Sequence, residues 1–156
     1  MPSTKAHVAQ GQIYDLRKLF KRLNGLYFNG SVKAQVEWGK SRGQKSRRSR
    51  EFGTYYYQEK LIRIHPVLDQ AWVPIYVVEA VLHHEMCHQV CPDQKMKGRR
   101  IAHTPAFRRR EREYPFFHEA ETWMKQNLQA LLRAAPTLKP QTLANQARQL
   151  ALSFAA

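Results

Sequence analysis

The sequence predicts an α+β domain in which a three-stranded sheet packs on one central helix, with further helices beside it. Three observations predict this class. Apolar residues recur at helical spacing over residues 12–28, three short strand-like patterns follow, and a long apolar run covers residues 74–90. The chain has 156 residues, of which 43% are hydrophobic. That amount is enough for one core without disulfide bridges.

The first half of the chain predicts a helix followed by three strands. Residues 12–28 form an amphipathic helical pattern, which ends at residues 29–30, Asn-Gly, where a left-handed turn is tolerated. Residues 32–38 alternate apolar and polar side chains and predict a half-buried strand. Two more strands are predicted over residues 52–57 and 61–65. Their proximity along the chain favours a hairpin.

The central helix is predicted over residues 74–90, because a proline suits the first helical turn and apolar residues fill the rest. Four apolar side chains fall on one face of this helix at a spacing of three or four residues. We expect this face to lie against the core. Its residues are Ile75, Val78, Leu82 and Met86.

The second half of the chain predicts a loop and two helices. Residues 94–102 are basic and predict a loop. Thr104 and Pro105 predict the start of a short helix, as its N-cap and its first residue. A last helix is predicted over residues 116–132.

The ends of the chain carry weaker patterns than the middle. We expect a flexible lead over residues 1–11, a domain over residues 12–133, and a weakly helical or disordered tail over residues 134–156. No apolar run has the length of a membrane span, and the first ten residues lack the apolar core of a signal peptide. Cys87 and Cys91 stand four apart on one helix, where a bridge fits poorly, so we expect both to be reduced. These features favour a cytoplasmic monomer with no membrane partner.

The central helix carries the pattern His-Glu-x-x-His at residues 84–88. His84 and His88 are four residues apart and therefore share one helix face, from which two imidazoles can bind one metal ion. Glu85 is rotated about 100° from His84 but only about 60° from His88, so its carboxylate can reach a water on that metal. This arrangement of two ligands and a general base is that of zinc hydrolases.

A catalytic zinc site needs a third protein ligand and leaves a fourth position for water. The best candidate is His103, which follows a loop and immediately precedes an N-cap, although a surface loop histidine is the alternative interpretation. His118 is better explained as a residue of the last helix. His83 and Cys87 are also four apart, but a metal there leaves Glu85 without a role. We therefore interpret Cys87 as a packing residue, and His83 either as a core histidine or as one that supports a metal ligand.

The charge of the chain favours a polyanionic partner. Twenty-six Lys and Arg residues stand against 12 Asp and Glu residues, which gives a formal net charge of +14. The basic residues cluster over residues 40–50, 95–100 and 108–112, and this clustering favours nucleic acid over a generally basic surface with no specific partner. The first cluster supplies the candidate nucleic-acid-binding residues, which are Lys40, Arg42, Lys45, Arg47, Arg48 and Arg50.

These motifs occur in a recognisable order. His84-Glu85-Met86-Cys87-His88 is followed by His103-Thr104-Pro105-Ala106-Phe107, and residues 23–30, 62–69 and 107–123 surround them. In this order the segments resemble those of the SprT-like zinc metalloproteases and the related YgjP-like (minigluzincin) metallopeptidases. The ordered set is far more specific than the pentapeptide alone.

The resemblance covers residues 13–130 and implies a compact zincin-like fold. It implies His84, His88 and His103 as ligands of Zn²⁺ and Glu85 as the catalytic base. It further implies a connection with DNA and with proteolysis of DNA-bound or crosslinked proteins. The chain departs from many SprT-like proteins in having no cysteines near its C-terminal end for a zinc ribbon.

The residues and the resemblance together predict a zinc-dependent endopeptidase. In this prediction Glu85 activates a metal-bound water for attack on peptide bonds. The expected partners are a protein or peptide substrate that is associated with DNA, and DNA itself. The strands before the central helix offer an edge for an extended peptide. Tyr114 and residues 55–57 are candidate hydroxyl donors to an oxyanion, although packing in the core or sheet explains them better.

The alternative function is a non-enzymatic basic module that binds nucleic acid and has a structural metal site. Glu85 separates the two functions, because a purely structural site needs no carboxylate at that position.

Overall fold

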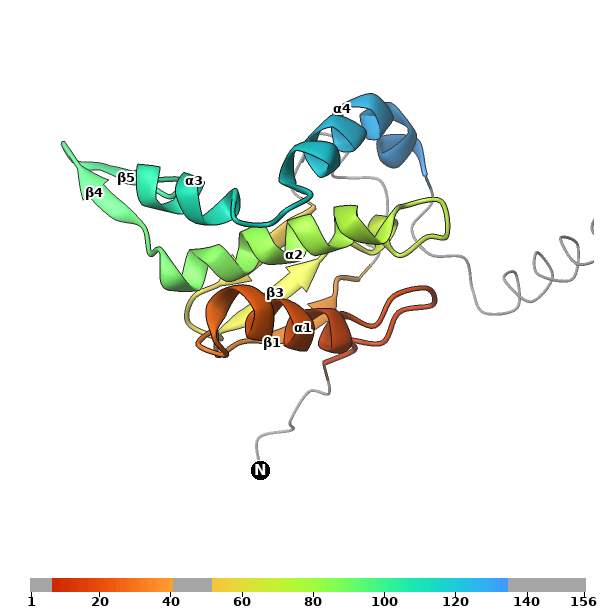
Figure 1. Cartoon of the computed structure of the whole chain (residues 1–156), viewed down its shortest axis with the longest axis horizontal. Helices are drawn as coiled ribbons and strands as arrows, with labels where there is room; N and C mark the ends of the chain where they lie inside the picture. Colours follow the sequence, from red (N-terminus) through yellow and green to blue (C-terminus); the bar gives the residue numbers. More distant parts are fainter. Residues whose placement is uncertain (1–6, 41–51, 135–156) are drawn as a thin grey trace, which may run out of the picture.

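The computed structural model describes residues 7–40 and 52–134, which form an α+β domain (Figure 1). Its sheet consists of β1 (Gln35–Trp38), β2 (Gly53–Tyr56) and β3 (Leu61–Ile64) in the order β1-β3-β2. The middle strand β3 is parallel to β1 and antiparallel to β2. Within the described residues β2 pairs with β3 only, so its other side is an open edge.

The helix α2 (Ile75–Val90) lies at the centre of the domain (Figure 1). It packs on β2 and β3, and it also contacts α1 (Leu16–Phe28), α3 (Pro105–Glu111) and α4 (Phe117–Arg133). The predicted class, a three-stranded sheet on a central helix with flanking helices, is therefore confirmed. No helix within residues 7–40 and 52–134 is long and apolar enough to span a membrane.

The core face of α2 is as predicted except at its first residue. Val78, Leu82 and Met86 are each 0% exposed, whereas Ile75 is 46% exposed. The prediction was wrong for Ile75 because side chains in a helix lean toward its N-terminus. The side chain of the first helical residue therefore extends past the end of the helix.

The first helix was predicted to begin at residue 12, but it begins at Leu16. The backbone N–H groups of Gln12, Ile13 and Tyr14 donate instead to the carboxylate of Asp69, at 2.7–2.9 Å. These three residues are therefore held outside the helix, and Asp15 becomes the N-cap.

The segment before the first helix packs on the domain. Ala9 is 3% exposed, and the N–H of Trp38 donates to the carbonyl of Val8 at 2.8 Å. The described part of the expected lead, residues 7–11, therefore lies alongside the end of β1.

All three predicted strands are shorter in the structure than expected, and at two of their ends local hydrogen bonds begin a different structure. Val32, predicted to begin the first strand, instead forms two hydrogen bonds with the side-chain amide of Asn24. His65, predicted to end the third, instead accepts from the N–H of Val67 and caps the 3₁₀ helix Pro66–Leu68.

The predicted basic loop at residues 94–102 is in fact a β-hairpin. Its strands are β4 (Gln94–Met96) and β5 (Arg99–Ile101), joined by the two-residue turn Lys97-Gly98. Both turn residues have positive φ, 48° and 75°, as this tight hairpin turn requires. The prediction missed the hairpin because a lysine is uncommon at a positive φ.

Candidate metal centre and active-site cleft

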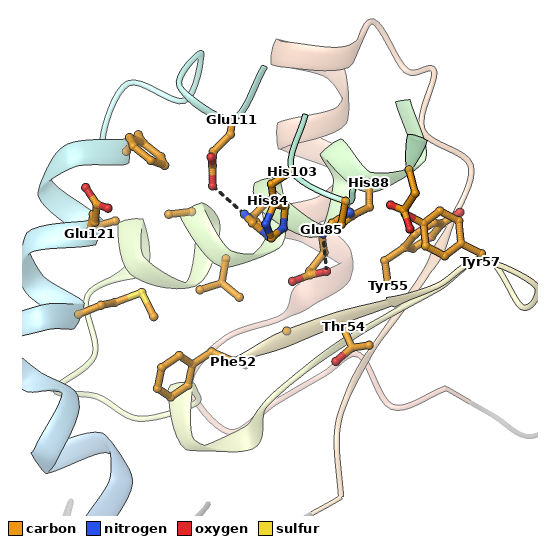
Figure 2. A pocket seen from close by; sticks show the side chains of 18 of the residues that line it. Phe52, Thr54, Tyr55, Tyr57, His84, Glu85, His88, His103, Glu111 and Glu121 are labelled. Atoms are coloured by element: carbon orange, nitrogen blue, oxygen red, sulfur yellow. Dashed lines mark hydrogen bonds and ion pairs between the residues drawn. The ribbon is translucent and has the colours of Figure 1, made fainter. Parts of the chain in front are cut away.

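Three histidines from two segments converge at one point. His84 and His88 come from successive turns of α2, and His103 comes from the segment between β5 and α3 (Figure 2). Each offers a ring nitrogen, and these three nitrogens all lie within 4.8 Å of one another. Among the described residues this trio is the group of histidine, cysteine and acidic side chains that could hold a metal ion.

Local structure explains how His103 reaches the helix. The β4–β5 hairpin reverses the chain after α2, so that it returns alongside that helix. Thr104 then accepts from the N–H of Phe107 at 3.2 Å and begins α3 as its N-cap. The ring of Phe107, 0% exposed, contacts all three histidine rings at centroid distances of 4.6–4.9 Å. The trio is thus packed on an apolar base.

A carboxylate orients the first histidine. The Nδ1 atom of His84 lies 2.7 Å from Oε1 of Glu111, at the end of α3 (Figure 2). With Nδ1 occupied, Nε2 is the ring nitrogen left for a metal. A carboxylate in this position fixes the tautomer of a ligating histidine and raises its basicity.

The ionisation of the site suits metal binding. Burial, together with the neighbouring His84 and His103, lowers the pKa of His88 to about 4. Burial and His84 also lower the pKa of His103. Burial opposes the charge on Glu111, but the hydrogen bond from His84 and nearby positive charge keep its pKa below the usual value. The lowered pKa values favour the neutral imidazoles of His88 and His103, and the neutral form is the one that ligates metals.

Glu85 lies beside the trio and is 5% exposed. Its Oε2 atom is 3.9 Å from Nε2 of His88. The strand β2 approaches this side chain closely at Gly53, where an added Cβ would lie 2.8 Å from both Cγ and Oε1 of Glu85. A glycine at this position therefore makes room for the carboxylate.

The trio and Glu85 face a cleft of about 640 Å³. β2 forms one side of this cleft with residues 53–55, and α4 contributes a wall on another side. Figure 2 shows Phe52 and Glu121 on one side of the histidines, and Tyr55 and Tyr57 on the other. The cleft therefore extends to both sides of the trio.

The donor set fits zinc. Three imidazoles from the protein, with a cleft beside them, match the donor set of a catalytic zinc site, which keeps one coordination position for water or substrate. Structural zinc sites instead close the coordination sphere with four protein ligands, commonly cysteines.

Comparison with protein-family models places this geometry in a family. The model of the SprT-like family matches residues 16–130, which include every element from α1 to most of α4. The chain belongs to the SprT-like family. No curated protein and no solved structure gave a significant match.

The alternative ligands His83, Cys87 and His118 are not part of the histidine trio in this SprT-like domain. His83 is 1% exposed and packs against the rings of Phe28 and Tyr114. Its Nδ1 atom lies 3.7 Å from Sγ of the buried Cys87. His118 is exposed on α4. The interpretation of His83 and Cys87 as core residues agrees with these contacts.

Sequence reasoning did not find Glu111. It lies within the basic cluster at residues 108–112, where the other four residues are arginines. The available signal was spacing, because Glu111 follows the inward-facing Phe107 by four residues and so shares its side of α3.

The four candidate tyrosines have different surroundings. Tyr114 is 2% exposed and donates to Oε2 of Glu79 at 2.7 Å, and Tyr56 accepts from Arg63 at 3.0 Å. Tyr55 and Tyr57 line the cleft. These two are therefore the tyrosines that a substrate can meet.

The candidate nucleic-acid residues fall mostly outside the described ranges. Lys40 is exposed at the end of the segment 7–40. The remaining five, Arg42, Lys45, Arg47, Arg48 and Arg50, lie outside the residues that the structure describes.

Proposed function

We propose that this SprT-like domain is a zinc-dependent endopeptidase in which His84, His88 and His103 hold the metal and Glu85 is the general base. One observation carries the proposal. Three imidazole nitrogens lie within 4.8 Å of one another, beside a carboxylate from the same helix, in a cleft edged by an open strand. A structural site gains nothing from such a cleft or from Glu85.

The chain supplies the proton transfers. When bound, zinc acts as a Lewis acid and lowers the pKa of water in its open position toward about 7. Glu85 takes the proton of the attacking water and returns it to the leaving amine. Glu111 holds His84 in one tautomer, so that Nε2 remains a ligand throughout.

The edge of β2 supports binding of an extended peptide. Within the described residues this strand has no partner on the side away from β3, and its residues 53–55 line the cleft. Peptides add to such edges by main-chain hydrogen bonds. A peptide bound there places a carbonyl beside the trio and Glu85. Side chains of the peptide then enter the cleft on either side of the histidines.

The test combines metal analysis with hydrolysis by matched variants. The wild-type protein is expected to bind one zinc ion and to cleave denatured casein. Glu85→Gln should retain zinc and lose activity by about 10²–10⁴-fold, the usual contribution of a general base. Glu119→Gln changes an exposed glutamate on α4 in the same way and should leave both properties unchanged.

Two results would reject the peptidase. Full activity of Glu85→Gln would exclude Glu85 as the base. Zinc bound tightly by a wild-type protein that hydrolyses nothing, with or without DNA, would favour the alternative, a non-enzymatic module with a structural metal.

We further propose that the substrates are proteins held near nucleic acid. The β4–β5 hairpin exposes Lys95, Lys97 and Arg99, and α3 exposes Arg108 and Arg109. Arg100 of the hairpin and Glu111 of α3 line the cleft together with His103, so both elements adjoin it. A phosphate backbone bound along them would lie at the mouth of the cleft, so that a protein on the nucleic acid is presented to the site.

A further inference from the structure

The two directions of the cleft differ in chemistry. On the side of Tyr55 and Tyr57 the wall is polar, because Tyr57 donates to Oδ1 of Asp93 at 2.7 Å, and the guanidinium of Arg100 pairs with the same carboxylate. The opposite side is mainly apolar, and Glu121 is the acidic residue that also lines it. The apolar side chains come from α2, from α4 and from the residue before β2. They are Phe52, Ala80, Val81, Phe117, Ala120 and Met124.

The apolar side is formed where α4 crosses α2. Residues 117, 120 and 124 are spaced by three or four and therefore present one face of α4. Ala80 and Val81 stand one turn of α2 before His84, so the apolar wall begins next to the trio. Phe52 closes the far side just before β2 and is 8% exposed. We call this part of the cleft the apolar chamber.

We propose that the apolar chamber is a specificity subsite that accepts a bulky apolar side chain of the substrate, such as Leu or Phe, adjacent to the scissile bond. The inference rests on the proposed peptidase function and names the substrate class of that site. A side chain that enters the chamber removes apolar area on both partners from water, and this burial favours binding in proportion to the area.

The competing ligand is a basic side chain directed at Glu121, the carboxylate of α4 that lines the cleft. Its side chain is 49% exposed, and Nζ of Lys125 lies 3.5 Å from its Oε1. Glu121 is thus hydrated and already close to a cation, so it offers little to a second one. The two alanines leave space between the larger side chains, which suits an aliphatic or aromatic group.

The first experiment measures binding without turnover. The chain has four methionines, and Met124 is the one in the chamber, whereas Met96 is 56% exposed on β4. Zinc-loaded Glu85→Gln protein with ¹³C-methyl methionine is titrated with Gly/Ser/Ala peptides that carry one central Leu, Phe, Lys or Glu. We expect a saturable shift of the Met124 methyl signal, with affinity about tenfold higher for Leu and Phe than for Lys and Glu. The Met96 signal should stay in place.

The second experiment measures cleavage by the wild type and by chamber variants. Mapped cleavage sites should have Leu, Phe or Met on one fixed side of the cut bond. Met124→Trp, which fills the chamber, should lower kcat/KM for the Phe peptide about tenfold more than for an Ala peptide. Met124→Ala should move the preference toward larger residues, whereas Met96→Ala should change nothing.

The outcomes separate this inference from the proposed function. Equal shifts of Met124 with all peptides, no shift with any, or a preference for Lys would overturn the apolar chamber as a subsite. A wild-type protein that cleaves no peptide would instead reject the peptidase, and the Met124 titration would still decide what the chamber binds. Cleavage without residue preference would leave the peptidase standing and reject the subsite.

Discussion

Glu111 binds the imidazole of His84 at the site's outer edge, with 2.7 Å between Oε1 and Nδ1. The contact joins the end of α3 to the central helix across 27 residues of sequence. It fixes which nitrogen of His84 faces the cleft, and it places a negative charge behind a ligand of the proposed metal.

We predict that Glu111→Gln weakens zinc binding by about 10–100-fold, the usual effect of losing such a carboxylate. The amide can still accept a hydrogen bond but no longer carries the charge. Competition with a zinc-chelating dye measures the affinity. Glu113→Gln serves as the control, because it removes an exposed carboxylate that lies two residues from Glu111 and pairs with Arg110. Equal affinities of the wild type and Glu111→Gln would show that Glu111 has no part in the site.

Gly53 offers a test of how β2 positions Glu85. A Cβ at residue 53 would lie 2.8 Å from Cγ and Oε1 of Glu85 and 3.0 Å from Cγ1 of Val81. Gly53→Ala must therefore displace the carboxylate or separate β2 from α2. We predict a fall in kcat of about 10²-fold with zinc content unchanged, because small misplacements of a catalytic group are that costly.

The matched control for this variant is Gly25→Ala. An added Cβ at residue 25 meets nothing within 4 Å, and the position is an exposed one inside α1. This variant should keep full activity and raise the free energy of unfolding by about 1 kcal/mol, the helix-propensity difference between the residues. If Gly53→Ala also retained full activity, β2 would not set the position of Glu85.

The sequence predicted the parts of the site that depend on local geometry. The spacing of His84 and His88 follows from the helix period, and the place of His103 follows from the N-cap at Thr104. Glu111 was missed because its partner is distant in sequence and its neighbours are arginines. The apolar chamber was missed for a related reason, since it exists only where α4 meets α2 and β2.

The same distinction applies to the fold. The strands and helices were recognisable from their periods, but the start of α1 depends on Asp69, more than fifty residues later. The hairpin after α2 depends on an unusual backbone conformation at Lys97, for which the side chain gives no signal.

Asp69 should make a large contribution to stability. It is 4% exposed and accepts three backbone hydrogen bonds, from Gln12, Ile13 and Tyr14. We predict that Asp69→Ala lowers the free energy of unfolding by roughly 3 kcal/mol, because it leaves buried donors without a partner. Urea denaturation measures the change.

Asp15→Ala provides the comparison, because Asp15 also accepts from backbone N–H groups but does so as an N-cap whose hydrogen bonds are exposed to solvent. Its loss should cost about 1 kcal/mol. Limited proteolysis should cut Asp69→Ala, but not Asp15→Ala, more readily before residue 15. Equal destabilisation by the two substitutions would show that Asp69 does not anchor the segment.

The β4–β5 hairpin tests whether nucleic acid binds beside the cleft. Lys95, Lys97 and Arg99 are exposed on it. If they contact phosphates, replacing all three with Ala should weaken DNA binding and reduce the slope of log K against log salt by about 2–3, close to one for each lost contact. Fluorescence anisotropy with a labelled duplex over a range of salt concentrations measures both quantities.

The control for the hairpin removes the same charge from another surface. Arg17, Lys18 and Lys21 are exposed on the first two turns of α1, which Figure 1 shows across α2 from the hairpin. Their triple Ala variant should retain the salt slope of the wild type and most of its affinity, because charges on that face lie far from the bound phosphates and are screened by salt. Equal losses of DNA affinity in the two triple variants would mean that DNA binding depends on the net charge alone. The hairpin would then have no special role in bringing substrates to the cleft.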